Sequence, residues 1–480
     1  MRQGLERAVW GRAVFSAAVV LCFLFFLTGQ LNFYLAESLK NGAYLLLAPV
    51  LTAGAVCLCR PKGKTEYRLL LVYMLWVVIT RVLNGDHALS REYRFVLDLS
   101  LMLPFLLLGL TLDRAGRRRL LNWLSVLLGL YFFALGTACI AAFLLHTEFY
   151  NPITGGVLAG VSATTSFERA NILDTNPNAA AYWFFMPLTL MIFQFFACRR
   201  RLWRIPIVLS ALVDWLVICL SFSRSVRLAA ALCFALLAAL LCARALKGRA
   251  LWLRALAVLL AFALLLPLGY KAGDWAGSGI GLLSRSITAR RESVSAAAET
   301  AARPAAFPAA LASKAGADTP AEPEEGRYTD PRAGRRGLDS ISSERLSVWR
   351  AVWQTLRENP RILLFGSASD EGLALVNAHL AEPVVQCHNF LLQTLLLAGL
   401  PGLLCVLLLC VLLLAAALRM LFSALPLPRQ LLCLPVLGSL LFGQLEAGFF
   451  NYTDARALFF YLMCGVMLGE YYDSFPAREQ

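Results

Sequence analysis

The chain has 480 residues, of which 59% are apolar, and its mean hydropathy is +0.66. This composition excludes a soluble globular protein, because apolar stretches long enough to cross a bilayer recur along most of the chain. The net charge of +14 would suit a nucleic-acid partner, but the placement of the basic residues excludes that class. We therefore predict an all-α integral membrane protein.

Apolar segments of membrane-spanning length predict about twelve transmembrane helices. The first segment has basic flanks and no small-residue cleavage site after it, so we expect a retained helix rather than a signal peptide. In chain order the predicted helices cover residues 13–34, 42–59, 69–84, 95–112, 120–146, 179–197, 205–222, 228–243, 251–270, 389–418, 431–448 and 455–472.

The basic residues favour one side of the membrane. If the N-terminus is cytoplasmic, the inside segments carry far more Lys and Arg than the short outside loops, which is the positive-inside pattern. An even number of helices then places both termini in the cytoplasm. The positive charge is thus explained by topology and contact with the lipid bilayer, without a nucleic-acid partner. Of the thirteen cysteines, only Cys387 is expected at the end of an outside loop, so no outside disulfide framework is predicted within the chain.

One long polar insertion, 271–387, separates predicted helices 1–9 (1–270) from predicted helices 10–12 (388–480), and the topology places it outside as an extracytoplasmic loop. Its first part, 275–291, mixes apolar and basic residues and is expected to form an interfacial helix. Its second part, 292–337, is rich in Ala, Pro, Glu and Ser and lacks apolar periodicity, which predicts a disordered tether.

The last part of the insertion predicts an amphipathic helix over 343–358. Apolar residues recur there at spacings of three and four. Ser343 is the expected N-cap, Asn359-Pro360 the expected stop, and Arg345 would lie in the first turn. The recurring apolar residues are Leu346, Trp349, Val352, Trp353 and Leu356.

Two arginines on the outside need an explanation. Arg224 lies in the short turn "SFSRSVR" between two apolar helices, and Arg345 lies near a helix N-terminus. Each has two open interpretations. The side chain can reach the lipid headgroups, or its guanidinium can bind phosphate oxygens bidentately, as an anion site near a helix start would require.

His388, one of only four histidines, is the outside residue best suited to acid–base chemistry at neutral pH. The competing interpretation is an interfacial or capping residue. Asn389 would orient the imidazole ring or cap the following helix. Both Asn389 and Glu446 are candidates for substrate binding. Glu446 either completes a site near the last outside loop or pairs with an arginine.

Further residues on the outside are candidates for substrate binding, since a basic outer rim also suits anionic headgroups. They are Arg169, Arg227 and Arg285, with Arg290 and Arg291 beside the last of these.

The sequence lacks the motifs that several kinds of enzyme require. The chain has no Walker-type loop, no His or Cys pair at zinc spacing, no Asp-x-Asp and no Gly-x-Ser-x-Gly. We therefore predict neither a cofactor nor a metal.

The sequence resembles the O-antigen ligase and polysaccharide polymerase superfamily. His388 and Gly399 form a His-x10-Gly element within "HNFLLQTLLLAGLPG". "ERLSVWRAVWQTLRENPRILLFGSA", "SFSRS" and "NPNAAAYW" are similar to three further family segments. The chain departs from the ligase pattern Arg-x3-Leu, because Trp349 follows Arg345, and the insert 292–337 has no family counterpart.

The resemblance implies a metal-independent glycosyltransferase in the bacterial cytoplasmic (inner) membrane. Its donor would be a polyprenyl-pyrophosphate-linked glycan, and its acceptor a glycan or glycolipid outside that membrane. His388 would then orient or deprotonate the acceptor hydroxyl, while Arg224 and Arg345 would stabilise the leaving pyrophosphate. The residues leave ligase and polymerase equally open.

Two alternatives remain. A cell-wall glycan polymerase of the shape and division type would rely on an outside aspartate, here Asp454 or Asp174. A transporter or flippase of a lipid-linked sugar would be expected to show an internal repeat, and the sequence shows none.

Overall fold

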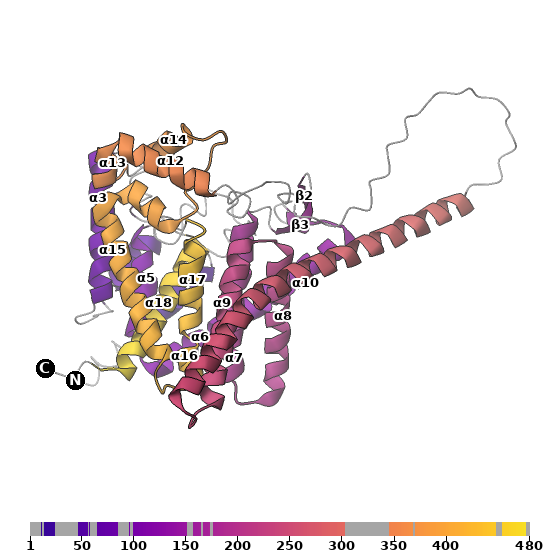
Figure 1. Ribbon diagram of the computed structural model, residues 1–480, viewed down its shortest axis with the longest axis horizontal. Helices are drawn as coiled ribbons and strands as arrows, with labels where there is room; N and C mark the ends of the chain where they lie inside the picture. Colours follow the sequence, from indigo (N-terminus) through magenta and orange to yellow (C-terminus); the bar gives the residue numbers. More distant parts are fainter. Residues whose placement is uncertain are drawn as a thin grey trace.

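The computed structural model describes residues 14–24, 47–55, 65–84, 99–150, 157–164, 167–172, 176–302, 345–367, 370–447 and 454–476, with single residues 11, 57 and 96. Ser343, Asp174 and residues 303–337 lie outside this part of the chain. Long helices run side by side as a bundle, and three short helices lie across one end of it (Figure 1).

Each predicted apolar segment holds a helix where it is described. Helices from the first third of the chain are Val14–Leu24, α3 (Thr65–Asn84), α5 (Met102–Thr111) and α6 (Arg114–Leu145). Then follow α7 (Pro177–Ala197), η1 (Arg201–Trp203), α8 (Arg204–Leu220), α9 (Arg224–Ala245) and α10 (Leu251–Ala302). The last are α15 (Phe390–Leu421), α16 (Leu427–Gln430), α17 (Cys433–Gly443) and α18 (Ala455–Ser474).

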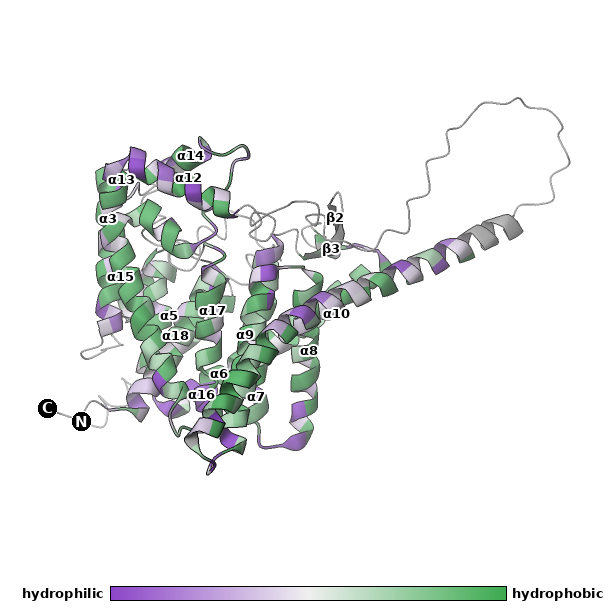
Figure 2. Ribbon diagram, viewed as in Figure 1, coloured by the Kyte–Doolittle hydropathy of each residue, from purple (hydrophilic) through white to green (hydrophobic). Residues whose placement is uncertain are grey.

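Among the described residues, six helices are long and apolar enough to cross a membrane. Hydrophobic residues make up most of the helices of the bundle (Figure 2), so the fold is that of a helical membrane protein. Twelve crossings and the cytoplasmic termini stay predictions. The six helices are Arg114–Leu145, Pro177–Ala197, Arg201–Leu220, Arg224–Ala245, Trp252–Ser295 and Phe390–Leu421.

The ninth helix is longer than predicted. Instead of ending at residue 270, α10 continues through the predicted interfacial helix to Ala302, so residues 271–302 are helical and not loop. Its polar half extends away from the bundle (Figure 1). A helix satisfies its own backbone hydrogen bonds and therefore need not end where the sequence turns polar. Ser284 also fastens it to α6, because its Oγ donates to the carbonyl of Phe143 at 2.7 Å.

A small antiparallel sheet was not predicted in this all-α architecture. Strands β1 (Phe149–Tyr150), β2 (Val157–Thr164) and β3 (Phe167–Ile172) pair in the order β1-β2-β3. Gly160 lies opposite Asn171 in the register of β2 and β3. The chain reaches the sheet from α6 through His146, whose left-handed backbone (φ 47°) ends that helix.

The three short helices form an outer layer over one end of the bundle (Figure 1). They are α12 (Arg345–Glu358), α13 (Pro360–Phe365) and α14 (Asp370–Asn377). The amphipathic helix predicted over 343–358 corresponds to α12, although Trp353 faces outward and is 48% exposed. Buried Val352, Leu356, Val376 and Leu395 join this layer to the start of α15.

Candidate active site

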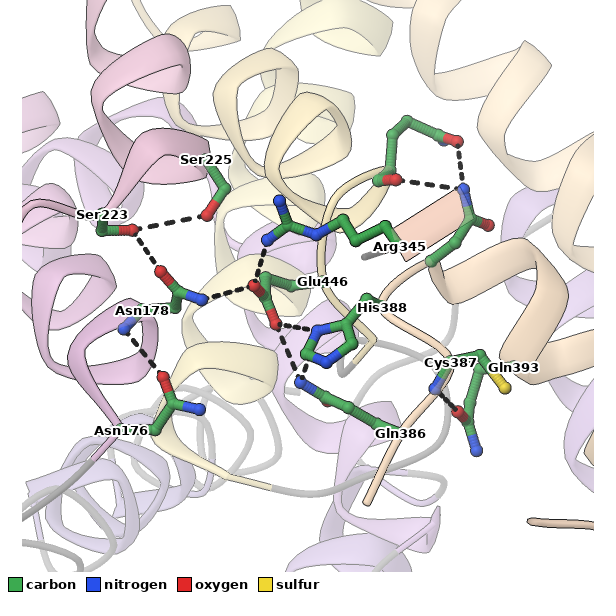
Figure 3. Close-up of polar contacts among 12 residues, drawn as sticks. Asn176, Asn178, Ser223, Ser225, Arg345, Gln386, Cys387, His388, Gln393 and Glu446 are labelled. Carbon is green, nitrogen blue, oxygen red and sulfur yellow. Dashed lines mark hydrogen bonds and ion pairs between the residues drawn. The ribbon is translucent and has the colours of Figure 1, made fainter. Parts of the chain in front are cut away.

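Glu446 is the centre of a buried polar cluster where the outer layer meets the bundle (Figure 3). It follows α17, and its side chain is only 3% exposed. Arg345 Nη2 and Asn178 Nδ2 lie 2.8 Å and 2.6 Å from Oε1. Gln386 Nε2 and His388 Nδ1 lie 2.8 Å and 3.2 Å from Oε2. One carboxylate thus binds residues from three other parts of the chain.

The backbone around His388 holds its ring against this carboxylate. His388 has a left-handed conformation (φ 50°), uncommon for a residue with a side chain. Before it, the carbonyl of Cys387 accepts from Trp349 Nε1 at 3.1 Å. After it, Asn389 Oδ1 accepts from the backbone N–H groups of Leu391 and Leu392 and so caps α15. Asn389 therefore caps the helix, one of its two predicted roles.

His388 is arranged to act as a base through its other ring nitrogen. Nδ1 lies 3.2 Å from Glu446 Oε2 and 3.3 Å from Gln386 Nε2, which itself donates to Oε2 at 2.8 Å. An ionised carboxylate only accepts hydrogen bonds, so the contact with Glu446 favours a proton on Nδ1. In the neutral ring this leaves Nε2 with a lone pair. The side chain is 25% exposed, so a reactant can reach it.

Arg345 contributes positive charge at the first turn of α12. Its Nη2 donates to Glu446, but its buried Nε has no hydrogen-bond partner among the described residues. An unpaired buried donor costs about 1–3 kcal/mol, so a ligand anion would stabilise this group.

The charges around Glu446 keep it ionised. Burial acts to raise the pKa of the Glu446 carboxyl. The hydrogen bond and the charge of His388, followed by the charge and hydrogen bond of Arg345, outweigh burial and hold that pKa below its ordinary value. At neutral pH the cluster therefore contains a carboxylate paired with a guanidinium, beside a histidine.

Asn178 and Ser223 extend the cluster to the start of α9 (Figure 3). Ser223 is the N-cap of α9, and its Oγ donates to Asn178 Oδ1 at 2.7 Å. Arg224, the first residue of α9, follows Ser223 directly and is half-buried. The Ser-Arg turn predicted to bind phosphate is therefore tied to the same cluster.

The remaining substrate-binding candidates lie elsewhere. Arg227 pairs with Asp274 of α10, and its guanidinium lies 5.3 Å from the ring centre of Tyr270. Arg285 is exposed on α10. Arg169 belongs to β3, opposite Ser162. The structure thus gathers His388, Asn389, Arg345 and Glu446, and Arg224 directly follows Ser223, which reaches Glu446 through Asn178.

Gln386, Asn178 and Ser223 were not predicted as site residues. Each stands in a sequence segment already singled out, two residues before His388, within "NPNAAAYW" or within "SFSRS". That position was the available signal, but their shared partner Glu446 is far away in the sequence. Among the described residues, no group of three or more His, Cys, Asp and Glu side chains could hold a metal ion.

Asp454, the aspartate of the alternative mechanism, is a helix cap. Its Oδ1 accepts from the backbone N–H of Ala457 at 2.9 Å, and Arg456 Nε lies 2.5 Å from its Oδ2. Both carboxylate oxygens are therefore engaged in starting α18.

The sequence model of the O-antigen ligase family matches residues 207–407. This range runs from α8 into α15 and includes Arg224, Arg345 and His388. The match confirms the family resemblance of the motifs and indicates a membrane ligase or polymerase acting on glycans. No curated protein and no solved structure matches the chain significantly.

Proposed function

We propose that the protein is a membrane glycosyltransferase that transfers or polymerises a polyprenyl-pyrophosphate-linked glycan on the extracytoplasmic face. The observation that carries the proposal is Glu446, which holds His388 and Arg345 on its two oxygens. This arrangement places a base and an anion-binding group side by side, as transfer from a pyrophosphate donor requires. The family match, which covers both His388 and Arg345, supports the same chemistry.

In the proposed reaction the acceptor hydroxyl attacks the anomeric carbon of the donor sugar. A new C–O bond forms as the bond between that carbon and the pyrophosphate oxygen breaks. The lipid pyrophosphate leaves with the electron pair, and the hydroxyl proton passes to His388 Nε2. Arg345 and Arg224 stabilise the charge on the leaving group, so the step needs no metal.

Glu446, predicted from the sequence as a substrate-binding residue, has a different role in this mechanism. Its oxygens already accept from four protein groups, which leaves little capacity for a sugar hydroxyl. It is proposed to hold the His388 ring and to stabilise the imidazolium that forms when Nε2 takes the proton.

The partners follow from this chemistry. The donor is a polyprenyl-pyrophosphate glycan held in the bilayer of the cytoplasmic (inner) membrane. The acceptor is a glycan or a glycolipid, so ligation and polymerisation are both compatible with the same base and anion site.

The test is glycan transfer by the purified protein in proteoliposomes with a radiolabelled lipid-linked donor. We expect His388→Ala to lose about 10²–10⁴-fold in rate, and Arg345→Ala and Arg224→Ala to lose roughly 10²-fold or more each. Arg350→Ala is the matched control, because this exposed arginine lies on α12 but outside the cluster. It should transfer at the wild-type rate.

Normal polymer from His388→Ala and Arg224→Ala would overturn the proposal. Movement of the donor across the membrane without a new glycosidic bond would instead identify a transporter.

A further inference from the structure

Asn178 joins two parts of the site that different helices carry. Asn176 caps α7, and its Oδ1 accepts from the backbone N–H of Asn178 at 2.9 Å. This bond fixes the start of α7 and with it the position of Asn178. The side chain of Asn178 then bridges Ser223 at the start of α9 and Glu446 after α17 (Figure 3).

The two bonds of Asn178 agree on one orientation of its amide. Its Nδ2 group lies 2.6 Å from Glu446 Oε1, and a carboxylate can only accept, so the NH₂ group must face it. Oδ1 then points to Ser223, whose hydroxyl donates to it at 2.7 Å. A flipped amide would set two acceptors against each other at Glu446.

The orientation of the Asn178 amide also affects His388, because both side chains bind the same carboxylate. With Oε1 shared by Asn178 and Arg345, the carboxylate is held so that Oε2 faces Gln386 and His388. With Gln386 Nε2 donating to Oε2, the contact of Nδ1 with the same oxygen makes Nδ1 the donor and Nε2 the basic nitrogen. The directions of the bonds from Ser223 to His388 all follow from the Glu446 carboxylate, which can only accept hydrogen bonds.

We infer that Asn178 is a positioning residue that fixes His388 in its basic tautomer through Glu446. The inference rests on the proposed function, in which Nε2 of His388 takes the acceptor proton. Asn178 touches no reactant in this role. It acts by holding a carboxylate that has three other partners, Arg345 on α12 and the pair Gln386 and His388 before α15.

The charges facing Glu446 decide how loss of Asn178 affects His388. They are Arg345 from α12, His388 before α15 and, through its longer-range charge, Arg456 from α18. Asn178 is neutral, so removing it leaves the carboxylate charged but less well stabilised. That charge then attracts a proton to His388 more strongly. Removing the charge itself has the opposite effect.

The experiment compares transfer rates across pH in proteoliposomes with the polyprenyl-pyrophosphate donor. Asn178→Ala should be slower by about 10- to 100-fold, and the acid limb of its pH profile should move to higher pH. Isosteric Asn178→Asp, which cannot donate and adds a negative charge, should move the limb further in that direction. Glu446→Gln should move the limb to lower pH.

Asn176→Ser is the matched control. It keeps an acceptor for the cap of α7, adds no charge and does not touch Glu446, so the pH profile should stay that of the wild type. Melting temperatures in detergent identify variants that fail to fold. If both Asn178 variants fail, Ser223→Ala removes the hydroxyl bond to Oδ1 together with the cap bond from the backbone N–H of Val226, and it should still move the limb to higher pH.

An acid limb unchanged in the folded Asn178 variants, or in Ser223→Ala, would overturn the inference whatever the rate, because a purely structural loss lowers the rate without moving the limb. Failure of the proposed function is a distinct result. There the wild type forms no glycosidic bond, or His388→Ala transfers as the wild type does.

Discussion

The backbones of Gly366 and Gly399 meet where the outer layer joins the bundle. A Cβ on Gly399 would lie 2.7 Å from the backbone nitrogen of Gly366 and 2.5 Å from the carbonyl oxygen of Leu364. Both glycines have positive φ angles, 78° and 64°, and Gly399 marks the kink in α15. The glycine of the His-x10-Gly element therefore fastens the layer that carries Arg345 to the helix that His388 precedes.

Gly399→Ala should destabilise the protein and impair transfer together. A side chain at a left-handed position costs about 1–2 kcal/mol, and the contact with the α13 turn adds to it, so we expect a loss of roughly 2 kcal/mol or more. Denaturation in detergent micelles measures this loss. Gly279→Ala is the control, because a Cβ there meets nothing within 4 Å in α10. It should gain about 0.5–1 kcal/mol, and equal stability of the two variants would contradict the packing argument.

Arg227 and Asp274 should behave as a structural pair. The Arg227 side chain is 6% exposed and that of Asp274 is 33% exposed. Asp274→Ala leaves a nearly buried guanidinium without its carboxylate. We expect a loss of about 1–3 kcal/mol, below the 3–5 kcal/mol of a fully buried pair, because solvent screens Asp274.

The double variant Arg227→Met/Asp274→Ala tests that pair, because it should recover most of the stability. A substrate-binding role for Arg227 would show in the donor KM instead. The KM of folded Arg227→Met should stay within about twofold of the wild type if the pair is structural.

The sequence located the helices better than it located their ends. Hydropathy reports where a segment suits a bilayer, so it ended the ninth helix at residue 270 and missed the polar half of α10. That half is held by particular contacts, such as Ser284 with the carbonyl of Phe143, that no periodicity encodes. The strands β2 and β3 were missed because strands this short show only a weak alternation of apolar and polar residues, while the apolar helices around them give a strong signal.

The candidate site shows the same limit. His388, Arg345 and Arg224 were predicted because each is a costly polar residue near the membrane boundary. Glu446, the common partner of His388 and Arg345, was predicted either to complete a site or to pair with an arginine. Its contact with His388 was not predicted, since it joins residues on either side of α15, α16 and α17. Asn178 was missed because its role depends on the orientation of one amide, which only the folded chain determines.

Acid should weaken the contact between the outer layer and the bundle. The pKa of Glu446 is lowered from its ordinary value of 4.5, so its contribution to stability is fully present above that pH. The contribution is lost as the pH falls through the lower pKa of the folded state. The stability difference between the wild type and Glu446→Gln should therefore shrink as the pH falls from about 5 to about 3. Thermal unfolding in detergent across this range measures it, and a constant difference down to pH 3 would contradict the assignment.

Asp454→Asn should separate this site from an aspartate-dependent glycan polymerase. Asn is as good an N-cap as Asp, so the bond to the Ala457 backbone N–H survives, while the ion pair with Arg456 is lost. We expect a stability loss of about 1–3 kcal/mol and a transfer rate within a few-fold of the wild type, because neither Asp454 oxygen is free to act on a reactant. His388→Ala, measured in the same proteoliposome assay, should lose at least about a hundredfold. The reverse outcome, with Asp454→Asn inactive and His388→Ala active, would move the chemistry to the start of α18.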